Sequence, residues 1–145
     1  MYKRILVPTD GTERAARALE TALQLARLGG GRIVGLHACA PPVLDPDSAM
    51  AGNPLQDGWR CERVQLAQDA LDYVTRRASE EGIPSVTVLS RKDDAWEAII
   101  ETARDHACDL IVMAAHGERG LVARLLGSET RKVLTHSAIP VLVLR

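Results

Sequence analysis

The sequence predicts a single α/β domain, a three-layer sandwich in which helices cover both faces of a five-stranded parallel sheet. Short apolar runs alternate with amphipathic stretches in the order βαβαβαβαβ along the chain. Each stretch between two strands is long enough for a crossover helix, which parallel strands require. The length of 145 residues suits one domain, and the 46% hydrophobic content is enough for one core. We therefore treat residues 1–145 as one domain.

The first half of the chain contains two predicted strands and one predicted helix. The run "RILVP" at 4–8 indicates a strand that ends in the turn "PTDG". An apolar stripe with steps of three and four residues predicts a helix over 12–28, which "GGG" at 29–31 terminates. The run "RIVGLHA" at 32–38 predicts the second strand. The stripe consists of Ala15, Ala18, Leu19, Ala22, Leu25 and Ala26.

The alternation of strand and helix patterns is interrupted at 39–58 and then resumes. Residues 39–58 contain four prolines, and we expect a long, irregular and mobile loop there. A helical stripe begins at about Arg60, and strands and helices alternate from there to the end of the chain. The expected strands are 85–89, 109–114 and 140–144, and the last expected helix is 128–136. The stripe positions are Val64, Ala67, Leu71, Val74 and Ala78 in one helix, and Trp96, Ile99, Ile100, Ala103 and Ala107 in the next.

Composition and motifs argue against several classes of protein. Lys and Arg total 18 against 19 Asp and Glu, a net charge of -1, so a nucleic-acid partner is not indicated. The three cysteines are widely spaced, and neither a disulfide framework nor a zinc site is signalled. No apolar run approaches the length that spans a membrane, and we expect a cytoplasmic protein. The strings G-x4-G-K-[ST] and G-x-G-x-x-G of two nucleotide-binding folds are absent.

Histidines give little support for catalysis or metal binding. His116, together with Asp10 and Ser128, suggests a hydrolase triad, but no G-x-S-x-G elbow surrounds the serine. His37 lies inside an apolar strand, which is more typical of a hydrogen-bonded core histidine than of a ligand. His106 and Cys108 form a weak metal pattern without further partners, so we expect no metal site built from protein side chains.

The segment after the fourth strand has features of a phosphate site. In "AHGERGLVARLLGSE", Gly117 is followed by nine residues and then by Gly127 and Ser128 at the start of a helix. A helix N-terminus offers unpaired N–H groups, and glycines allow close approach of a phosphate. Four basic and two acidic residues between 118 and 132 give this segment a charge of +2. An ordinary connection with Ser128 as an N-cap explains the spacing equally well.

Asp10 adds a second feature at the same edge of the sheet. It follows the first strand, and ligands of open α/β sheets bind beyond the carboxyl ends of the strands. A carboxylate there can accept hydrogen bonds from a ribose or cap the following helix. The last strand, in contrast, is expected at a sheet edge, where pairing with a second copy would cover it.

Over nearly its full length the chain resembles the universal stress protein family. The resemblance rests on "KRILVPTDGTERAARAL", "VGLHA", "LIVMAAHGERGLVARLLGSETRKVL" and "SAIPVLVLR". It implies a Rossmann-like, adenine nucleotide alpha-hydrolase-like fold with the sheet order 3-2-1-4-5. The nucleotide-binding branch of the family carries G-x2-G-x9-G-[ST], and this chain matches three of the four marker positions. The first glycine is replaced by Ala114, which we expect to keep a strand-like φ.

The resemblance also implies a set of binding residues. Pro8, Thr9 and Asp10 would face adenosine, with Asp10 on the ribose, and the backbone of Ala38 would lie at adenine. Residues of the loop would surround the rest of the nucleotide, and the helix start would meet its phosphates. These residues are Met113, Ala114, His116, Gly117, Gly127, Ser128 and Glu129.

Three functions remain open at this point. The first is a homodimeric stress-response sensor or adaptor that binds ATP or a related adenine nucleotide, with Mg²⁺ recruited by the phosphates. The dimer would form through strand 140–144. The second is a nucleotide-free partner-binding module of the same fold, in which Ala114 marks lost binding. The third is a slow ATPase, for which the sequence shows no catalytic base.

Overall fold

A computed structural model of the protein describes residues 1–39, 54–115 and 127–145, with the backbone alone for 54–62. The strands are β1 (Arg4–Pro8), β2 (Arg32–Ala38), β3 (Ser85–Ser90), β4 (Leu110–Ala114) and β5 (Val141–Leu144). The helices are α1 (Glu13–Gly29), α2 (Pro54–Glu80), α3 (Ala95–Asp105) and α4 (Ser128–His136). All strand pairs are parallel, and the order β3-β2-β1-β4-β5 confirms the expected sheet.

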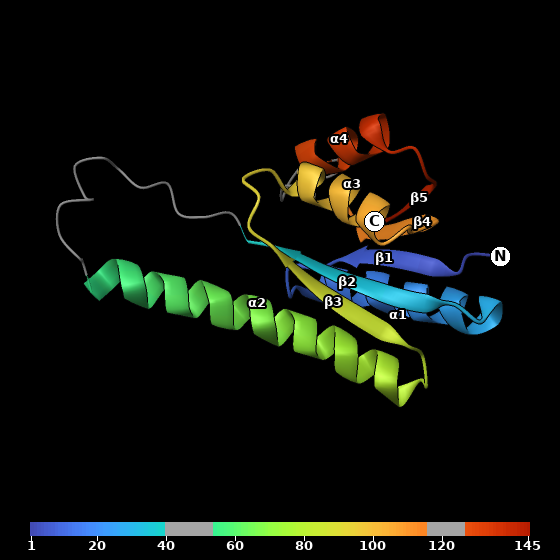
Figure 1. Cartoon of the computed structure of the whole chain (residues 1–145), viewed down its shortest axis with the longest axis horizontal. Coiled ribbons are helices and arrows are strands. Elements are labelled where there is room, and N and C mark those ends of the chain that lie inside the picture. The colour runs from blue at the N-terminus through green and yellow to red at the C-terminus, as the bar shows by residue number, and fades with distance from the viewer. Residues whose placement is uncertain (40–53, 116–126) are drawn as a thin grey trace.

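The sheet lies between two helical layers, α1 with α2 on one face and α3 with α4 on the other (Figure 1). Alternation along β1 divides its side chains between two cores: Ile5 and Val7 pack toward α1, and Leu6 packs toward α3. All five residues of β4 are buried, because helices cover both faces of this strand. The predicted three-layer sandwich is therefore confirmed.

Helix α1 begins and ends much as the sequence predicts. Thr12 is the N-cap, and its hydroxyl accepts a hydrogen bond from the N–H of Ala15. Gly30 has a φ of 61° and ends the helix in the left-handed conformation that glycine adopts most easily. The predicted stripe is buried except at Leu25, which is only partly buried, and Leu23 is a core residue that the stripe missed.

Helix α2 departs from the prediction at its start. It begins at Pro54 instead of about Arg60, so residues 54–58 of the expected loop are helical. Proline is tolerated in the first turn of a helix because its missing N–H has no partner there, and an internal glycine such as Gly58 costs only about 1 kcal/mol. Val64, expected in the core, is 43% exposed because the first turns of α2 extend past the sheet (Figure 1). The rest of the expected loop, 40–53, lies outside the described residues.

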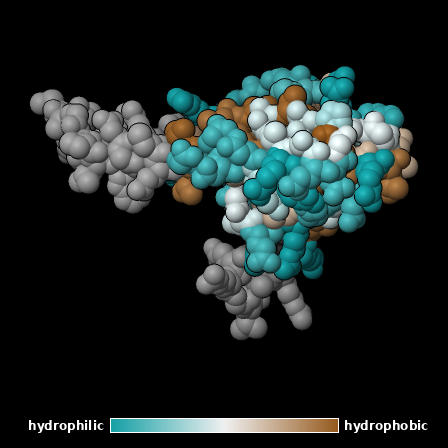
Figure 2. All heavy atoms as spheres, turned by 90° about the horizontal axis from the view of Figure 1, so that it is seen from below, coloured by the Kyte–Doolittle hydropathy of each residue, from teal (hydrophilic) through white to brown (hydrophobic). Residues whose placement is uncertain are grey.

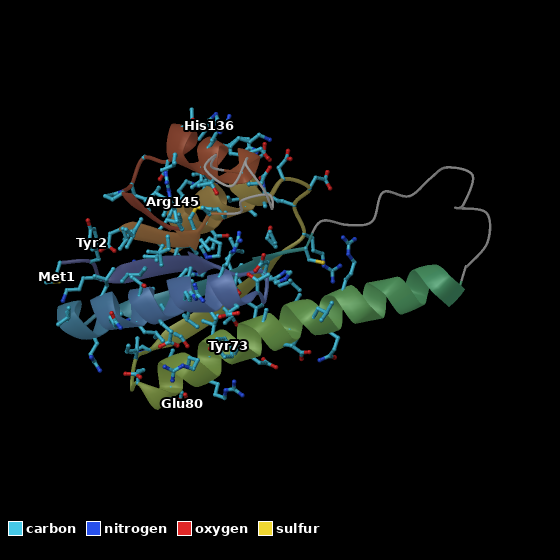
Figure 3. All side chains as sticks on the ribbon, turned by 180° about the vertical axis from the view of Figure 1, so that it is seen from behind. Met1, Tyr2, Tyr73, Glu80, His136 and Arg145 are labelled. Atoms are coloured by element: carbon cyan, nitrogen blue, oxygen red, sulfur yellow. The ribbon has the colours of Figure 1, made fainter. Side chains whose placement is uncertain are left out.

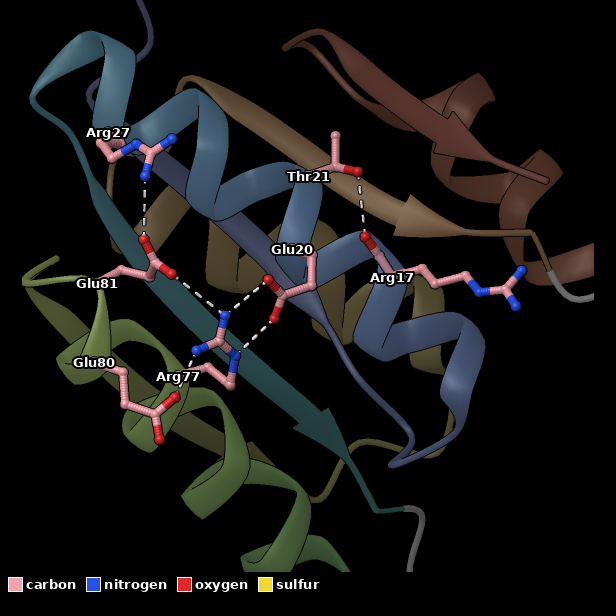
Figure 4. Close-up of polar contacts among 7 residues, drawn as sticks. All are labelled: Arg17, Glu20, Thr21, Arg27, Arg77, Glu80 and Glu81. Atoms are coloured by element: carbon pink, nitrogen blue, oxygen red, sulfur yellow. Dashed lines mark hydrogen bonds and ion pairs between the residues drawn. The ribbon is translucent and has the colours of Figure 1, made fainter.

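A salt-bridge network joins α1 to α2 (Figure 4). The guanidinium of Arg77 donates to both carboxylate oxygens of Glu20 at 2.8 Å and also contacts Glu80 and Glu81. This bidentate bond to Arg77 lowers the pKa of Glu20, and burial partly opposes the shift. Glu81 also pairs with Arg27 of α1 at 3.4 Å. The network links the two helices over the core that they share on this face of the sheet.

The surface is mainly hydrophilic on the face that Figure 2 shows, with hydrophobic side chains interrupting it. No helix among the described residues is both long and apolar enough to cross a lipid bilayer. Strand β5 is an edge of the sheet, as expected, and Leu142 on it is 36% exposed.

Helix α2 packs closely on the backbone of Gly35 in β2. A Cβ at this position would lie 2.9 Å from Cγ1 of Val74 in α2.

Candidate functional site

A cavity of about 230 Å³ opens at the carboxyl ends of β1, β2 and β4. We call it the strand-end cavity. It lies at the end of the strands opposite to Met1 and Tyr2, which precede β1 (Figure 3). This is the edge at which open parallel sheets bind ligands. Its lining residues are Pro8, Thr9, Asp10, Ala15, Leu36, Ala38, Ala95, Ile99, Met113, Ala114 and Glu129.

Of the eleven residues predicted for the site, nine are described, and seven of these line the strand-end cavity. They come from the ends of three strands and the start of α4. Gly127 and Ser128 are not part of its lining, although they directly precede Glu129. His116 and Gly117 lie outside the described residues.

The turn after β1 holds Asp10 in place. The N–H of Thr9 donates to the carbonyl of Leu36 at 2.8 Å, which ties the turn to β2. Asp10 Oδ1 accepts hydrogen bonds from the N–H and the hydroxyl of Thr12 at 3.0 and 2.6 Å. Thr12, and not Asp10, caps α1, so Asp10 acts through an Asx-type turn and its carboxylate stays exposed. A carboxylate has about four acceptor positions, so the turn leaves Asp10 able to accept from a ligand hydroxyl.

Ala114 has the backbone conformation that the sequence analysis expected. It is the last residue of β4, pairs with Leu144 of β5, and is not among the described residues with positive φ. The next N–H, of Ala115, continues the ladder to the carbonyl of Leu144 at 2.8 Å. The methyl group of Ala114 therefore causes no backbone strain, and the side chain packs in the core that faces α1.

The start of α4 differs from the simplest expectation. Gly127 is the N-cap with a φ of −58°, and Ser128 is the first helical residue, so the interpretation of Ser128 as an N-cap is wrong. Arg131 donates its N–H to the carbonyl of Gly127, which closes the first turn. The N–H groups of the three residues before it belong to the first turn, where an α-helix provides no acceptor. They form the donor group that an anion at this helix end would meet.

Glu129 uses its side chain in an unexpected way. Its Oε2 accepts the N–H of Trp96 at 2.9 Å, and its Oε1 lies 3.6 Å from Nζ of Lys132. Helix α3 begins beside it, and the residue before that helix, Asp94, makes no side-chain cap. Glu129 therefore caps α3 from the neighbouring helix. The ring of Trp96 in turn stacks on His136 at the other end of α4, with 4.5 Å between ring centroids.

Within the described part of the chain, two buried side-chain atoms lack hydrogen-bond partners. Oγ1 of Thr130 is unpaired although Thr130 is completely buried in the first turn of α4. Nδ1 of His37 is also buried without a partner among the described residues, and the residue as a whole is half-buried, so His37 is not the fully hydrogen-bonded core histidine that was expected. Burial lowers the pKa of His37, and the negative charge of Asp10 partly opposes this shift. Unpaired buried groups are uncommon because each one costs free energy.

Sequence reasoning missed several lining residues of the strand-end cavity. Leu36 and Ile99 are apolar and gave no signal beyond their places in a strand and a helical stripe. Thr130, which is completely buried and not part of this lining, was not singled out either, although a hydroxyl two residues after Ser128 was a visible signal. A second cavity, of about 410 Å³, lies between the start of α1 and α2 and shares Thr9 and Asp10 with the first.

Comparisons with known proteins agree on one family. A sequence profile of the universal stress protein family matches residues 1–145. Universal stress protein MJ0531 of Methanocaldococcus jannaschii is 32% identical over 148 residues, which cover 100% of this chain and 83% of the relative. The solved structure of MJ0577, from the same organism, matches with a TM-score of 0.77 at 27% identity, covering 99% of this chain and 96% of that one.

Two further solved structures carry ligands. One is a universal stress protein in complex with cAMP, with a TM-score of 0.70, 23% identity and coverage of 99% of this chain and 97% of the other. The other is the universal stress protein of Archaeoglobus fulgidus in complex with dAMP, with a TM-score of 0.71, 20% identity and coverage of 99% and 98%. At these identities the likeness shows a shared fold.

Proposed function

Because the chain belongs to the universal stress protein family, we propose that it binds ATP or a related adenine nucleotide in the strand-end cavity. The observation that carries the proposal is that seven of the residues implied by the family resemblance line one cavity at the ligand-binding edge of the sheet. Two proteins of the same fold have been solved with the adenine nucleotides cAMP and dAMP, which supports this ligand class. Binding would make the protein a sensor or adaptor in the stress response.

The cavity offers a suitable group for each part of the ligand. Leu36, Ile99 and Met113 provide an apolar surface for the base, beside the backbone of Ala38. Asp10 would accept hydrogen bonds from the ribose hydroxyls. The first-turn N–H groups of α4 would meet the phosphates. The unpaired hydroxyl of Thr130 lies in the same turn and would gain a partner if a phosphate or an ordered water reached it.

We do not assign a catalytic group to this cavity. Among its described lining residues, the ionisable side chains are the carboxylates of Asp10 and Glu129, and the structure already uses both in hydrogen bonds. Slow ATP hydrolysis, with Mg²⁺ brought by the phosphates, is the alternative that a turnover assay tests. Steady release of phosphate above a buffer blank, lost in Asp10→Asn, would favour the ATPase over the sensor.

The binding proposal is tested by two measurements on the purified protein. Denaturation should release adenine nucleotide that co-purified with the chain, and calorimetry should show heat when ATP is titrated. If no nucleotide is released and no heat appears with ATP, AMP or adenosine at about 1 mM, a concentration at which even weak binding of about −4 kcal/mol registers, the proposal is wrong. The nucleotide-free partner-binding module is then the better description.

Gly127→Asp tests whether the start of α4 meets the phosphates. Aspartate is a favourable N-cap and fits the φ of −58°, so the helix should remain intact. The added carboxylate would repel the phosphates, and we expect affinity for ATP to fall at least about tenfold. The matched control is Gln24→Glu, which adds the same charge at an exposed position of α1. Unchanged ATP affinity in Gly127→Asp would show that this helix start is not part of the site.

We also propose a homodimer through residues 140–144. Strand β5 is an edge, with no neighbouring strand on one side among the described residues, and Leu142 on it is partly exposed. Pairing of β5 with its copy across a two-fold axis would satisfy the ladder groups of the strand and cover Leu142. Sedimentation should give a dimer that Leu142→Asp converts to a monomer, whereas Leu134→Asp, at an exposed leucine of α4, should leave the dimer intact. A monomeric wild-type protein would contradict the proposal.

We propose a cytoplasmic location as well. Cys39 and Cys108 are free thiols in the structure, as is usual for proteins of reducing compartments. Fractionation of cells that express the tagged full chain tests this location.

A further inference from the structure

The charged side chains in the described lining of the strand-end cavity do not match a highly charged anion. Among the lining residues that the structure describes, Asp10 and Glu129 are ionisable, and both are acidic. No lysine or arginine is part of this described lining. Asp10 follows β1, where the ribose is expected, and Glu129 is the second residue of α4, where the phosphates are expected. The negative charge of Glu129 is therefore at the phosphate end of the site.

The structure fixes the position of this charge. Glu129 Oε2 accepts the N–H of Trp96 at 2.9 Å, and the side chain of Glu129 is only 36% exposed. Turning the carboxylate away from the cavity would break this bond and leave the start of α3 without its cap. Lys132 lies 3.6 Å from Oε1, so its positive charge is already shared with Glu129. The carboxylate is thus held at the start of α3, on a residue that lines the cavity and belongs to the helix turn whose N–H groups would bind phosphate.

The start of α4 and the carboxylate of Glu129 have opposite effects on a bound anion. The N–H groups and dipole of a helix start attract phosphate, and a carboxylate in the same turn repels it. The repulsion increases with each negative charge on the ligand and is absent for an uncharged nucleoside. Glu129 would therefore weaken the binding of ATP more than that of AMP, and the binding of AMP more than that of adenosine.

From this we infer that Glu129 is a specificity-determining residue that makes the strand-end cavity favour adenine ligands with few phosphates over ATP. The inference rests on the proposed function and names, within its ligand class, the members that the site prefers. Glu129 acts here through its charge, whereas its bond to Trp96 serves only to hold that charge in place.

Glu129→Gln is the variant that separates charge from structure. The amide oxygen of glutamine can still accept the N–H of Trp96, so the cap on α3 is kept while the charge is removed. The matched control is Asp105→Asn, which removes one negative charge at the exposed far end of α3. Calorimetry with adenosine, AMP and ATP is performed on wild type, Glu129→Gln and Asp105→Asn.

We expect Glu129→Gln to bind adenosine within about twofold of wild type and ATP about tenfold more tightly, with AMP in between. The gain for ATP should shrink when the salt concentration rises from about 0.05 M to about 0.5 M, because salt screens exposed charges. Asp105→Asn should change none of the three affinities by more than about twofold, because its charge is far from the cavity. Glu129→Ala should also favour ATP over adenosine, because it removes the same charge.

Other results would overturn the inference in distinguishable ways. If Glu129→Gln changes the affinities for adenosine and for ATP by the same factor, the charge of Glu129 does not discriminate between the two ligands, and only this inference is wrong. If Glu129→Ala alone alters binding, the cap on α3 is responsible and the inference is again wrong. If no adenine ligand binds to wild type or to either variant, the proposed function fails and the inference fails with it.

Discussion

Replacing Gly35 by alanine tests how closely α2 packs on the sheet behind the candidate site. Gly35 is buried in β2, one residue before Leu36, which lines the strand-end cavity. A Cβ at Gly35 would lie 2.9 Å from Cγ1 of Val74 and 3.4 Å from Cγ2 of Thr87. Non-bonded carbon atoms prefer about 3.5–4.0 Å, so the contact with Val74 must open by about 0.6–1.1 Å.

The expected cost follows from what can move. Val74 is 1% exposed and β-branched, so its side chain has few other rotamers, and α2 must shift outward instead. Overpacking of this kind costs about 1–3 kcal/mol, and the smaller backbone entropy of unfolded alanine returns about 0.4–1 kcal/mol. We expect Gly35→Ala to lower the free energy of unfolding by about 1–2 kcal/mol.

Urea unfolding of a double-mutant cycle checks this reasoning. Val74→Ala alone should cost about 2–3 kcal/mol, because it removes two buried methyl groups and leaves a cavity. The double variant should be about 1–2 kcal/mol more stable than the sum of the single effects, because the new methyl enters the vacated space. The reasoning is refuted if Gly35→Ala stays within about 0.5 kcal/mol of wild type, or if the two effects add within that margin at unchanged m-value.

Three further predictions concern the site and the helix network. Ala114→Gly should bind ATP as tightly as wild type or more tightly, because Ala114 already has strand-like φ; a clear loss by calorimetry would mean that its methyl group supports the site. Asp10→Asn should lower the pKa of His37 further, because Asp10 is the charge that opposes the effect of burial; an NMR titration that shows a rise would contradict this. Arg77 lowers the pKa of Glu20, so the stability advantage of wild type over Glu20→Gln should be full above the ordinary pKa of 4.5 and vanish as pH falls through the lower folded value. Urea unfolding of both proteins between pH 3 and pH 7, a range of about four units, measures this advantage. If it does not depend on pH, the charge of Glu20 contributes nothing to the free energy of unfolding.

The arrangement of the elements was predictable because each one has a local cause. Strand β4 is a short run of apolar residues, since helices bury both of its faces, and such runs are visible in a sequence. Gly30 and the residues beside it mark the end of α1 because a left-handed residue is needed there. The family resemblance supplied the sheet order, and the structure confirms it.

The errors have a cause that lies outside any local pattern. Val64 has the right spacing for a core residue and is nevertheless 43% exposed, because burial also requires a sheet beneath the helix, and the first turns of α2 extend past the sheet (Figure 1). Pro54 and Gly58 are loop signals on average, and α2 nevertheless includes both, which a helix permits for proline in the first turn and at modest cost for glycine. Leu23 is the exception, because it lies four residues after Leu19 and three before Ala26 and so belongs to the same buried face by its spacing alone.

By itself the sequence determined the order and type of the elements and the marker residues at the strand ends, because hydrophobic period, caps and turns depend on neighbouring residues. Tertiary structure alone decided that, among the described residues, the hydroxyl of Thr130 and Nδ1 of His37 have no partner. It also decided that Glu129 caps α3 at Trp96 and that Asp10 and Glu129 line one cavity. Such contacts join residues that are distant in the chain, as Trp96 and Glu129 are by 33 positions. They depend on how helices sit on the sheet, which side-chain packing across the whole domain sets.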